Sequence, residues 1–593
     1  SISFTVDSAD APLPYPGTPG EDDEDALVHN VSNLDQFEPA VARAADGRYV
    51  VVWTSLNDPA LDEDGDPIED LTGTPIVYTN IYARMFDRYG EPTSGEILVS
   101  TYTAGPQSRP DVAIDDYGNF VVVWEGEGQG TDKKLDQTGI FARIFDAHGQ
   151  GSGDQIMVNV NRDGVQTQPA VAMNAMGQFV VTWRSHDHGG IIARQFTLDG
   201  TGGAELRVNT TTGNTHQFPD VAMNNDGSFA VTWTAAEQDN GSMGVYAQRF
   251  SAAGAKLGGE FRVNQYQTDR QEMSRIAMDD TGNFVIAWQS MGQDAFGGYG
   301  VYARRFNAAG TALSNEFRVN DFTAGYQFEP AVSMAPNGDF VVTWSSFKQE
   351  GDKGELYGIF AKMYNADGTL FVLPGQTVPV GEYRVNADIE GDQRNSDVSM
   401  DAGGHYAIVW QGKTVGLIPD PANPTTLITG EQIDVYARVV DPPIATAEDP
   451  TTLNLFGTPG IDTFEFVAGA SPSAWVVKIN GVAQTIASTV KTINFNGMGG
   501  NDIAVLTGTN GAEKVYAKPG EVEFIGSNFT VKATNVENVT VDGKGGADYA
   551  ELRDSAGNDS LIMRVGETTM VGIGYSNKVL NFEEVHGYAL NGG

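Results

Sequence analysis

The chain has 593 residues and a formal net charge of −42 at pH 7, from 36 basic and 78 acidic side chains. So strong an excess of negative charge disfavours binding to nucleic acid or to an anionic membrane surface. No run of 18 apolar residues occurs, so the sequence predicts no transmembrane helix. The absence of cysteine is compatible with an exported bacterial protein that needs no disulfides.

Seven of the eight tryptophans each close one copy of the same phrase: Gln-x-x-Pro, Val-Ala-Met, an Asp- or Asn-rich turn ending in Gly, and an apolar run into Trp. They are Trp53, Trp124, Trp183, Trp233, Trp288, Trp344 and Trp410. Each Trp is followed by a variable loop and, in most units, by two more short runs rich in β-branched and aromatic residues, which gives four predicted strands per unit. Four-stranded units repeated every 50 to 71 residues are typical of the blades of a β-propeller.

The number of fourth strands indicates how the ring closes. After Arg438 the chain runs directly into two prolines, so the seventh unit has no fourth strand of its own. Near the N-terminus, residues 4–7 (Phe-Thr-Val-Asp) have the form of the fourth strand at 261–264. We therefore expect an all-β fold, with a seven-bladed propeller over residues 1–443 that the N-terminal strand closes by pairing near Tyr436. An open solenoid, the alternative, leaves the terminal strands unpaired.

Two features of the blades are interpreted as structural. The segment Phe120–Trp124 is apolar at every position, which indicates a strand buried on both faces, so we expect the tryptophans in the core. A basic residue follows the Ala of the third strand in six units, and Gln248 replaces it in the remaining one. We expect these cations to pair with carboxylates within or between blades, because an acidic ring places carboxylates near them. The six are Arg84, Arg143, Arg194, Arg304, Lys362 and Arg438.

The loop after Trp53 is the best candidate for a metal site. Its positions 1, 3, 5 and 9 are Asp62, Asp64, Asp66 and Asp70. Such a loop suits calcium, which takes six to eight oxygen ligands. It resembles the calcium loops of integrin-type propeller blades, although its glycine stands at position 4 where that pattern has position 6. A solvated acidic loop is the alternative.

A second repeat, of 46 residues, occupies the region 445–593, where Gly497–Asp502 recurs as Gly543–Asp548. Glycine suits tight turns, so we expect a β-rich repeat domain, either a solenoid or a stacked sandwich. The turns resemble the Gly/Asp-rich calcium repeats of bacterial RTX exoproteins, and the propeller phrase resembles repeats of extracellular and cell-surface bacterial proteins. The resemblance implies an extracellular or cell-surface location. It also implies weaker calcium sites at Asp462, Asp502, Asp548 and Asp559, although RTX repeats run consecutively and these turns are isolated.

No catalytic residue is assigned from the sequence. There is no cysteine, and the seven histidines are scattered among the units. The segment 279–284 is similar to the Asp-containing hairpins of sialidase-like propellers, but their catalytic arginine cluster cannot be picked out. We therefore expect a non-catalytic structural or adhesive protein, a subunit of a fibre, sheath or surface layer. A secreted glycan-binding or glycan-cleaving propeller is the alternative.

The end of the chain suggests a longer polypeptide. In the 46-residue register Asp548 maps one position beyond Gly593, so we expect the native chain to continue and the second domain to be truncated. An open terminal turn predicts a homo-oligomer or a head-to-tail filament. A surface polysaccharide is the other expected partner.

Overall fold

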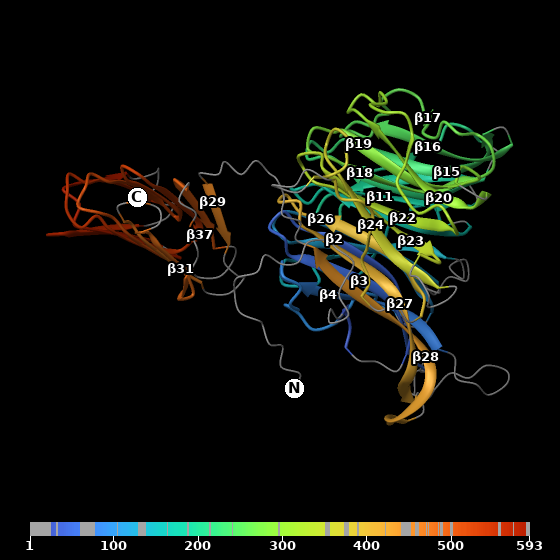
Figure 1. Ribbon diagram of the computed structural model, residues 1–593, viewed down its shortest axis with the longest axis horizontal. Coiled ribbons are helices and arrows are strands. Elements are labelled where there is room, and N and C mark those ends of the chain that lie inside the picture. Colours follow the sequence, from blue (N-terminus) through green and yellow to red (C-terminus); the bar gives the residue numbers. More distant parts are fainter. Residues whose placement is uncertain are drawn as a thin grey trace. The chain divides into compact units, whose positions relative to one another are not determined.

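A computed structural model describes residues 25–30, 34–59, 77–102, 105–127, 138–162, 164–186, 189–212, 215–239, 241–294, 297–349, 356–372, 379–387, 391–420, 423–440, 452–456, 462–469, 471, 474–483, 486, 490–497, 502–554, 559–572 and 574–588. The chain divides into two compact units, Ser1–Ile444 and Ala445–Gly593. Every regular element in the described residues is a strand (Figure 1). None of them is a helix long and apolar enough to cross a membrane.

The first unit is a seven-bladed β-propeller built from seven four-stranded antiparallel sheets. Blade 1 contains β2 (Gln36–Arg43), β3 (Tyr49–Pro59), β4 (Val77–Phe86) and β5 (Ile97–Leu98). Blade 2 contains β6 (Gln107–Ile114), β7 (Phe120–Gly126), β8 (Gly139–Phe145) and β9 (Ile156–Met157). Blade 3 contains β10 (Gln166–Met173), β11 (Phe179–Ser185), β12 (Gly190–Phe196) and β13 (Leu206–Arg207). Blade 4 contains β14 (His216–Met223), β15 (Phe229–Asp239), β16 (Ser242–Phe250) and β17 (Phe261–Arg262).

The remaining blades repeat this order. Blade 5 contains β18 (Gln271–Met278), β19 (Phe284–Met291), β20 (Tyr299–Phe306) and β21 (Phe317–Arg318). Blade 6 contains β22 (Gln327–Met334), β23 (Phe340–Phe347), β24 (Tyr357–Tyr364) and β25 (Tyr383–Arg384). Blade 7 contains β26 (Gln393–Met400), β27 (Tyr406–Asp420), β28 (Asn423–Val440) and, from the other end of the chain, β1 (Ala26–Leu27).

The closure of the ring by an N-terminal strand is confirmed, but the closing strand is not the expected one. Ala26 pairs with Ala437 and Leu27 with Tyr436, so β1 occupies the position that we predicted for residues 4–7. Those earlier residues lie outside the described part of the chain. Val28, just after β1, is buried with Tyr49 and Trp53 of blade 1, and this apolar contact completes the circle.

The core of the propeller is a series of apolar clusters, each formed between two neighbouring blades. The seven repeat tryptophans are at most 1 % exposed, as predicted for core residues. Each packs against the preceding blade, as Trp124 does against Val50 and Val52 of blade 1. The strands that carry them are buried on both faces because a blade lies on either side.

The cations of the third strands have a different partner from the one we predicted. Each of the six donates to a backbone carbonyl of the preceding blade, as when Arg194 Nη1 donates to Val158 O at 2.7 Å. Of these six, Lys362 also pairs with a carboxylate, that of Asp321 at 2.7 Å. Arg84 donates to Val28 O at 2.8 Å, so the same contact joins blade 1 to the closing segment. A charged group bonded to a buried carbonyl is one of the stronger single hydrogen bonds.

The second unit consists of two sheets around one apolar core. One has the order β29 (Thr452–Phe456), β33 (Thr492–Asn496), β37 (Thr530–Val536), β36 (Gly520–Ile525), β35 (Lys514–Lys518), β39 (Tyr549–Arg553) and β43 (Glu584–Tyr588). The other has the order β32 (Val482–Ala483), β31 (Val476–Ile479), β30 (Thr463–Val467), β34 (Ile503–Thr507), β38 (Asn538–Asp542), β42 (Tyr575–Leu580), β41 (Glu567–Gly572) and β40 (Ser560–Arg564). β30, β34, β38 and β42 pair in parallel, with partners 35 to 40 residues apart rather than the 46 of the sequence repeat. The expected β-rich domain is confirmed.

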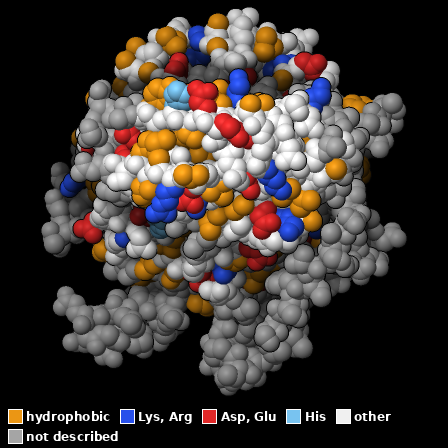
Figure 2. All heavy atoms as spheres, turned by 90° about the vertical axis from the view of Figure 1, so that its left-hand side faces the viewer, with side chains coloured by type: hydrophobic (Ala, Val, Ile, Leu, Met, Phe, Trp, Pro, Cys, Tyr) orange, Lys and Arg blue, Asp and Glu red, His pale blue; other side chains and the backbone are white. Residues whose placement is uncertain are grey.

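The net negative charge is not gathered into a single patch on the face that Figure 2 shows. Acidic and basic side chains lie there in small, separate groups among hydrophobic and uncharged ones. A charge distribution of this kind supports solubility without defining a binding surface.

Candidate functional site: a central pocket of the propeller

One unusual backbone conformation recurs in every blade. The third residue of each Gln-x-x-Pro phrase has φ between 51° and 56°, the left-handed region, although none of the seven is glycine. The pairing of the first two strands shifts register at the same place, so each is a β-bulge. The seven bulge residues are Glu38, Arg109, Gln168, Phe218, Met273, Glu329 and Asn395. A non-glycine residue in this region costs about 1–3 kcal/mol, and such strain is concentrated at functional sites.

The bulges are locked together in a circle. The backbone N–H of each bulge residue donates to a side-chain oxygen of the preceding blade. In three cases the acceptor is the preceding bulge residue itself, as when Arg109 N donates to Glu38 Oε2 at 2.9 Å. In the other four it is the residue that follows the repeat Trp, as when Gln168 N donates to Glu125 Oε2 at 2.9 Å. The strained residues are thereby held in fixed positions.

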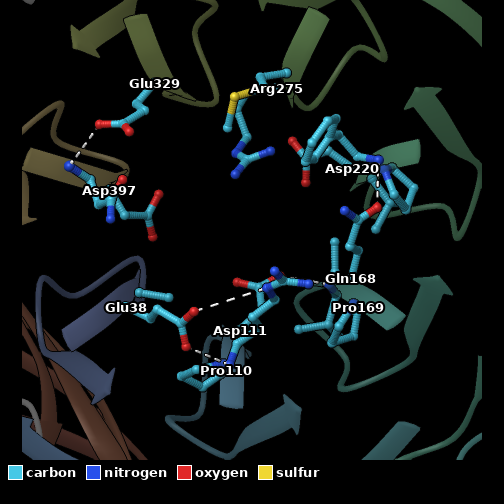
Figure 3. Close-up of a pocket in the computed structure, with 18 of the residues that line it drawn as sticks. Glu38, Pro110, Asp111, Gln168, Pro169, Asp220, Arg275, Glu329 and Asp397 are labelled. Carbon is cyan, nitrogen blue, oxygen red and sulfur yellow. Dashed lines mark hydrogen bonds and ion pairs between the residues drawn. The ribbon is translucent and has the colours of Figure 1, made fainter. Parts of the chain in front are cut away.

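The seven bulge residues line one pocket with a volume of about 430 Å³, where the first strands of the blades converge (Figure 3). The bulge segments pair with the last residues of the Trp strands, as Gln107 does with Gly126. The Trp strands therefore end on the same face of the propeller as the pocket, and each is followed in the sequence by a variable loop. A concave site surrounded by variable loops is the usual place for a ligand.

The residue two positions after the bulge differs in type from blade to blade. The residues are Ala40, Asp111, Ala170, Asp220, Arg275, Ala331 and Asp397 in blades 1 to 7. The three Asp and the Arg line the pocket. Arg275 points into the middle of it, with Asp220 on one side and Asp397 on the other (Figure 3). The repeat is therefore broken at the pocket, although the Trp positions behind it are uniform.

The three carboxyl groups also join blades. Asp111 Oδ2 accepts the N–H of Val171 at 2.7 Å, Asp220 Oδ2 that of Ile276 at 2.8 Å, and Asp397 Oδ2 that of Val41 at 2.8 Å. Each donor belongs to the next blade along the ring. Three blades have Ala at the same position, so this hydrogen bond is not required for a blade to form. The carboxyl groups are fixed in orientation by the fold and still face the pocket.

The electrostatics distinguish the three carboxyl groups. Burial, together with the charges of Asp397 and Asp220, raises the pKa of Asp111 to about 8. Burial also raises the pKa of Asp397, to about 6, while Arg275 and the backbone N–H of Val41 lower it. The pKa of Asp220 is raised by burial and lowered chiefly by Arg275. At neutral pH the pocket thus holds a protonated carboxyl group, Asp111, together with an ionised one, Asp397.

Two groups of ion pairs lie at the rim of the pocket. Arg109 Nη1 lies 3.4 Å from Glu125 Oε1, and its Nε lies 4.0 Å from Glu38 Oε1. Across the ring, Arg394 Nη2 lies 2.6 Å from Glu329 Oε1. The guanidinium of Arg394 also covers the rings of Phe328 and Tyr357. These pairs are partly exposed, so they contribute more to the shape of the rim than to stability.

The described residues that line this pocket include none of the candidate metal residues. Asp62, Asp64, Asp66 and Asp70 lie outside the described residues. In the second unit, Asp462 and Asp502 are fully buried, and Asp462 N donates to Asp502 Oδ1 at 2.7 Å. Asp548 Oδ1 accepts the N–H of Glu513 at 2.8 Å, so these acidic residues link neighbouring turns of the repeat.

Across the described part of the chain, no three His, Asp or Glu side chains gather in a way that could hold a metal ion. Asp559, the last candidate, lies beside β40. Calcium at any of these positions stays a prediction.

The pocket residues were missed in the sequence because they were treated as variable positions of a structural repeat. The signal was the pattern itself: five of the seven bulge residues precede a proline, and the position after that proline alternates between Ala and a charged residue. The segment 279–284, compared above with sialidase hairpins, forms a tight turn in which Asp279 Oδ1 accepts the N–H groups of Thr281 and Asn283. It lies at the other end of β18 from the bulge.

No family model and no curated protein matches the sequence. Among solved structures, a protein of unknown function from Dyadobacter fermentans is 12 % identical over 70 % of this chain and 97 % of its own, with a TM-score of 0.38. The GH93 α-L-arabinofuranosidase of Fusarium graminearum is 11 % identical over 71 % and 98 %, with a TM-score of 0.36. The α-L-arabinanase of Penicillium chrysogenum is 14 % identical over 72 % and 96 %, with a TM-score of 0.35. The likeness is one of fold.

These comparisons correct one expectation. We predicted a non-catalytic structural or adhesive protein and no enzyme, whereas the propellers to which the chain is similar are mostly glycan-cleaving enzymes. The alternative, a glycan-binding or glycan-cleaving propeller, agrees better with them. The loops, with their uneven lengths, show no repeated sugar site in the sequence, whereas the charged side chains converge at the axis of the ring.

Proposed function

We propose that the propeller binds a glycan in the central pocket and cleaves a glycosidic bond there. The observation that carries the proposal is the convergence of Asp111, Asp220 and Asp397 with Arg275 on one pocket, at a position where the other three blades have Ala. Glycoside hydrolysis needs one carboxyl group that donates a proton and one that is ionised. Asp111 and Asp397 are in these two states at neutral pH.

The reaction follows from these states. The carboxyl proton of Asp111 passes to the glycosidic oxygen as the bond from that oxygen to the anomeric carbon breaks. The carboxylate of Asp397 stabilises the positive charge that develops at the anomeric carbon and takes a proton from the water that attacks it. Arg275 favours the ionised forms of Asp397 and Asp220, since its charge lowers the pKa of both. The hydrogen bonds from the neighbouring blades hold both carboxyl groups in place before the substrate arrives.

The sequence resemblances support an extracellular location for this activity. Repeats similar to those of extracellular and cell-surface proteins fit an exported protein that meets polysaccharides outside the cell. Calcium in the loop at Asp62–Asp70 is proposed as a stabilising ion rather than a participant in the reaction.

Hydrolysis of a panel of polysaccharides, followed by reducing-end release, tests the proposal. Asp111→Asn and Asp397→Asn should each abolish release while glycan binding persists, and Asp154→Asn, on the exposed strand connection of blade 2, should leave both unchanged. Binding without hydrolysis by the unmodified protein would reduce the function to glycan recognition. Neither binding nor hydrolysis over the whole panel would refute it.

A further inference from the structure

The charged groups that line the pocket are unbalanced. Of the described residues there, five carry carboxyl groups and two carry guanidinium groups. They are Glu38, Asp111, Asp220, Glu329 and Asp397, with Arg109 and Arg275. Concave, partly buried sites focus the field of the charges that line them. The pocket therefore has a negative potential, even with Asp111 protonated.

Both guanidinium groups face carboxyl groups. Arg109 lies between two carboxylates, with Glu125 at 3.4 Å and Glu38 at 4.0 Å. Arg275 lies between Asp220 and Asp397 (Figure 3). Recognition of a carboxylate or sulfate depends on the paired donors of a guanidinium that is not already facing acidic groups. An anion entering this pocket would therefore meet acidic groups beside each basic one.

The uncharged part of the lining suits a neutral sugar. Phe218 and Met273 are the bulge residues of the neighbouring blades 4 and 5, and they form an apolar sector of the rim. Gln168 and Asn395 add amide groups. Sugar rings present C–H faces to apolar side chains and hydroxyl donors to carboxylates and amides. The pocket offers an acceptor-rich surface beside an apolar one.

We propose that the pocket takes an uncharged saccharide residue and rejects residues that carry a carboxylate or sulfate group. The inference rests on the proposed function, whose site it shares, and it adds the class of substrate. The sugar residue bound over Asp111, Asp220 and Asp397 is expected to carry no charge.

A glycan array that holds neutral, uronate-containing, sialylated and sulfated members tests the inference directly. We expect binding to neutral members at least tenfold tighter than to any acidic member of similar length. Binding confined to acidic glycans, or equal binding to both classes, overturns the inference and leaves the proposed function standing. No binding to any member overturns both.

A charge variant identifies the cause of the discrimination. Asp220→Asn removes an acidic group and keeps an oxygen that accepts the N–H of Ile276. It should lower the preference for neutral over acidic glycans by on the order of tenfold, while Asp154→Asn leaves the preference unchanged.

A test with the unmodified protein covers the case in which that variant does not fold. At about 1 M salt, where the Debye length is about 3 Å, acidic glycans should bind more tightly than at low salt and neutral ones equally well. An unchanged preference in both experiments refutes the electrostatic cause.

Discussion

The indole N–H of Trp124 donates to Oε1 of Gln107 at 2.8 Å, between two side chains that are both fully buried. The same pair, 17 residues apart, recurs as Trp53 with Gln36, Trp183 with Gln166 and Trp410 with Gln393. This contact explains why the repeat contains both residues: the side-chain oxygen of the Gln in the first strand accepts the hydrogen bond of the buried indole N–H in the second. In these four blades it also anchors the residue two places before the bulge.

Replacing Gln107 by Leu should therefore destabilise the propeller by about 1–3 kcal/mol, because it leaves a buried indole N–H without an acceptor. The change is measured as a shift of the urea midpoint for the propeller transition. Gln150→Leu, in an exposed turn of the same blade, is the control and should shift the midpoint little. Equal shifts for the two variants would contradict the role assigned to the pair.

The contact between a third-strand cation and the preceding blade makes a second prediction. Arg194→Gln copies the residue that blade 4 has at this position, and it removes the hydrogen bond from Nη1 to Val158 O. We expect a loss of about 1–3 kcal/mol in the free energy of unfolding, as for other hydrogen bonds to charged groups. Thermal melting measures it, and the reverse change Gln248→Arg in blade 4 should not lower stability by a similar amount. A stable Arg194→Gln protein would show that the contact contributes nothing.

Closure of the ring is tested at Val28, which is 1 % exposed between blades 7 and 1. Val28→Asp places a charge in that apolar cluster, at a cost that should release the closing segment from β28. A free edge on β28 should then promote association, visible as larger species in size-exclusion chromatography with light scattering. Leu27→Asp, at a more exposed neighbouring position, is the milder control. A monomeric Val28→Asp protein with normal stability would contradict closure by this segment.

The pocket predicts a bell-shaped dependence of hydrolysis on pH. Activity should fall as pH drops through about 6, where Asp397 becomes protonated, and as pH rises through about 8, where Asp111 loses its proton. Arg275→Gln removes the charge that lowers the pKa of Asp397, so the acid limb should move to higher pH. Arg275→Lys should keep the limb nearer its original place. If the acid limb does not move in Arg275→Gln, the charge of Arg275 does not control the pKa of Asp397.

The second unit should lose stability as pH rises. Burial raises the pKa of Asp502 and of Asp548 to about 6, from an ordinary value of 3.8. Because the folded state holds these protons more tightly than the unfolded state, stability is greatest below about pH 4 for these groups and falls as pH rises to about 6. Hydrogen exchange of residues 502–554 in the whole chain measures this, with Asp548→Asn expected to show a weaker dependence. Protection that increases with pH over this range would contradict the prediction.

The sequence predicted the fold well because the core residues recur in every repeat. Seven tryptophans, the strand phrases around them and the missing fourth strand defined the number of blades and the way the ring closes. The closing strand was misplaced because Ala26-Leu27-Val28-His29 matches the fourth-strand phrase less well than residues 4–7 do. Its true signal was Val28, whose apolar side chain stands where other blades have the Val of Arg-Val-Asn.

The site could not be predicted in the same way. Asp111, Asp220 and Asp397 lie more than 100 residues apart in the sequence (220−111=109 and 397−220=177), and only the closed ring brings them to one axis. A carboxyl group two residues after a bulge has no local pattern that distinguishes it from a surface Asp. The difference arises from burial and from the charges of other blades, which sequence spacing does not contain.

The pairing of Leu27 with Tyr436 sets the order in which the molecule can be assembled. β1 is synthesised some 400 residues before β28, its partner in blade 7. The N-terminal segment therefore remains unpaired while the chain of six other blades is made. Contacts of such long sequence separation slow folding, since the loop must close before the contact rewards it. During that interval β1 and the apolar edge of blade 1 are exposed to other chains. The step that finishes the ring is thus also the one at which misassembly competes with folding.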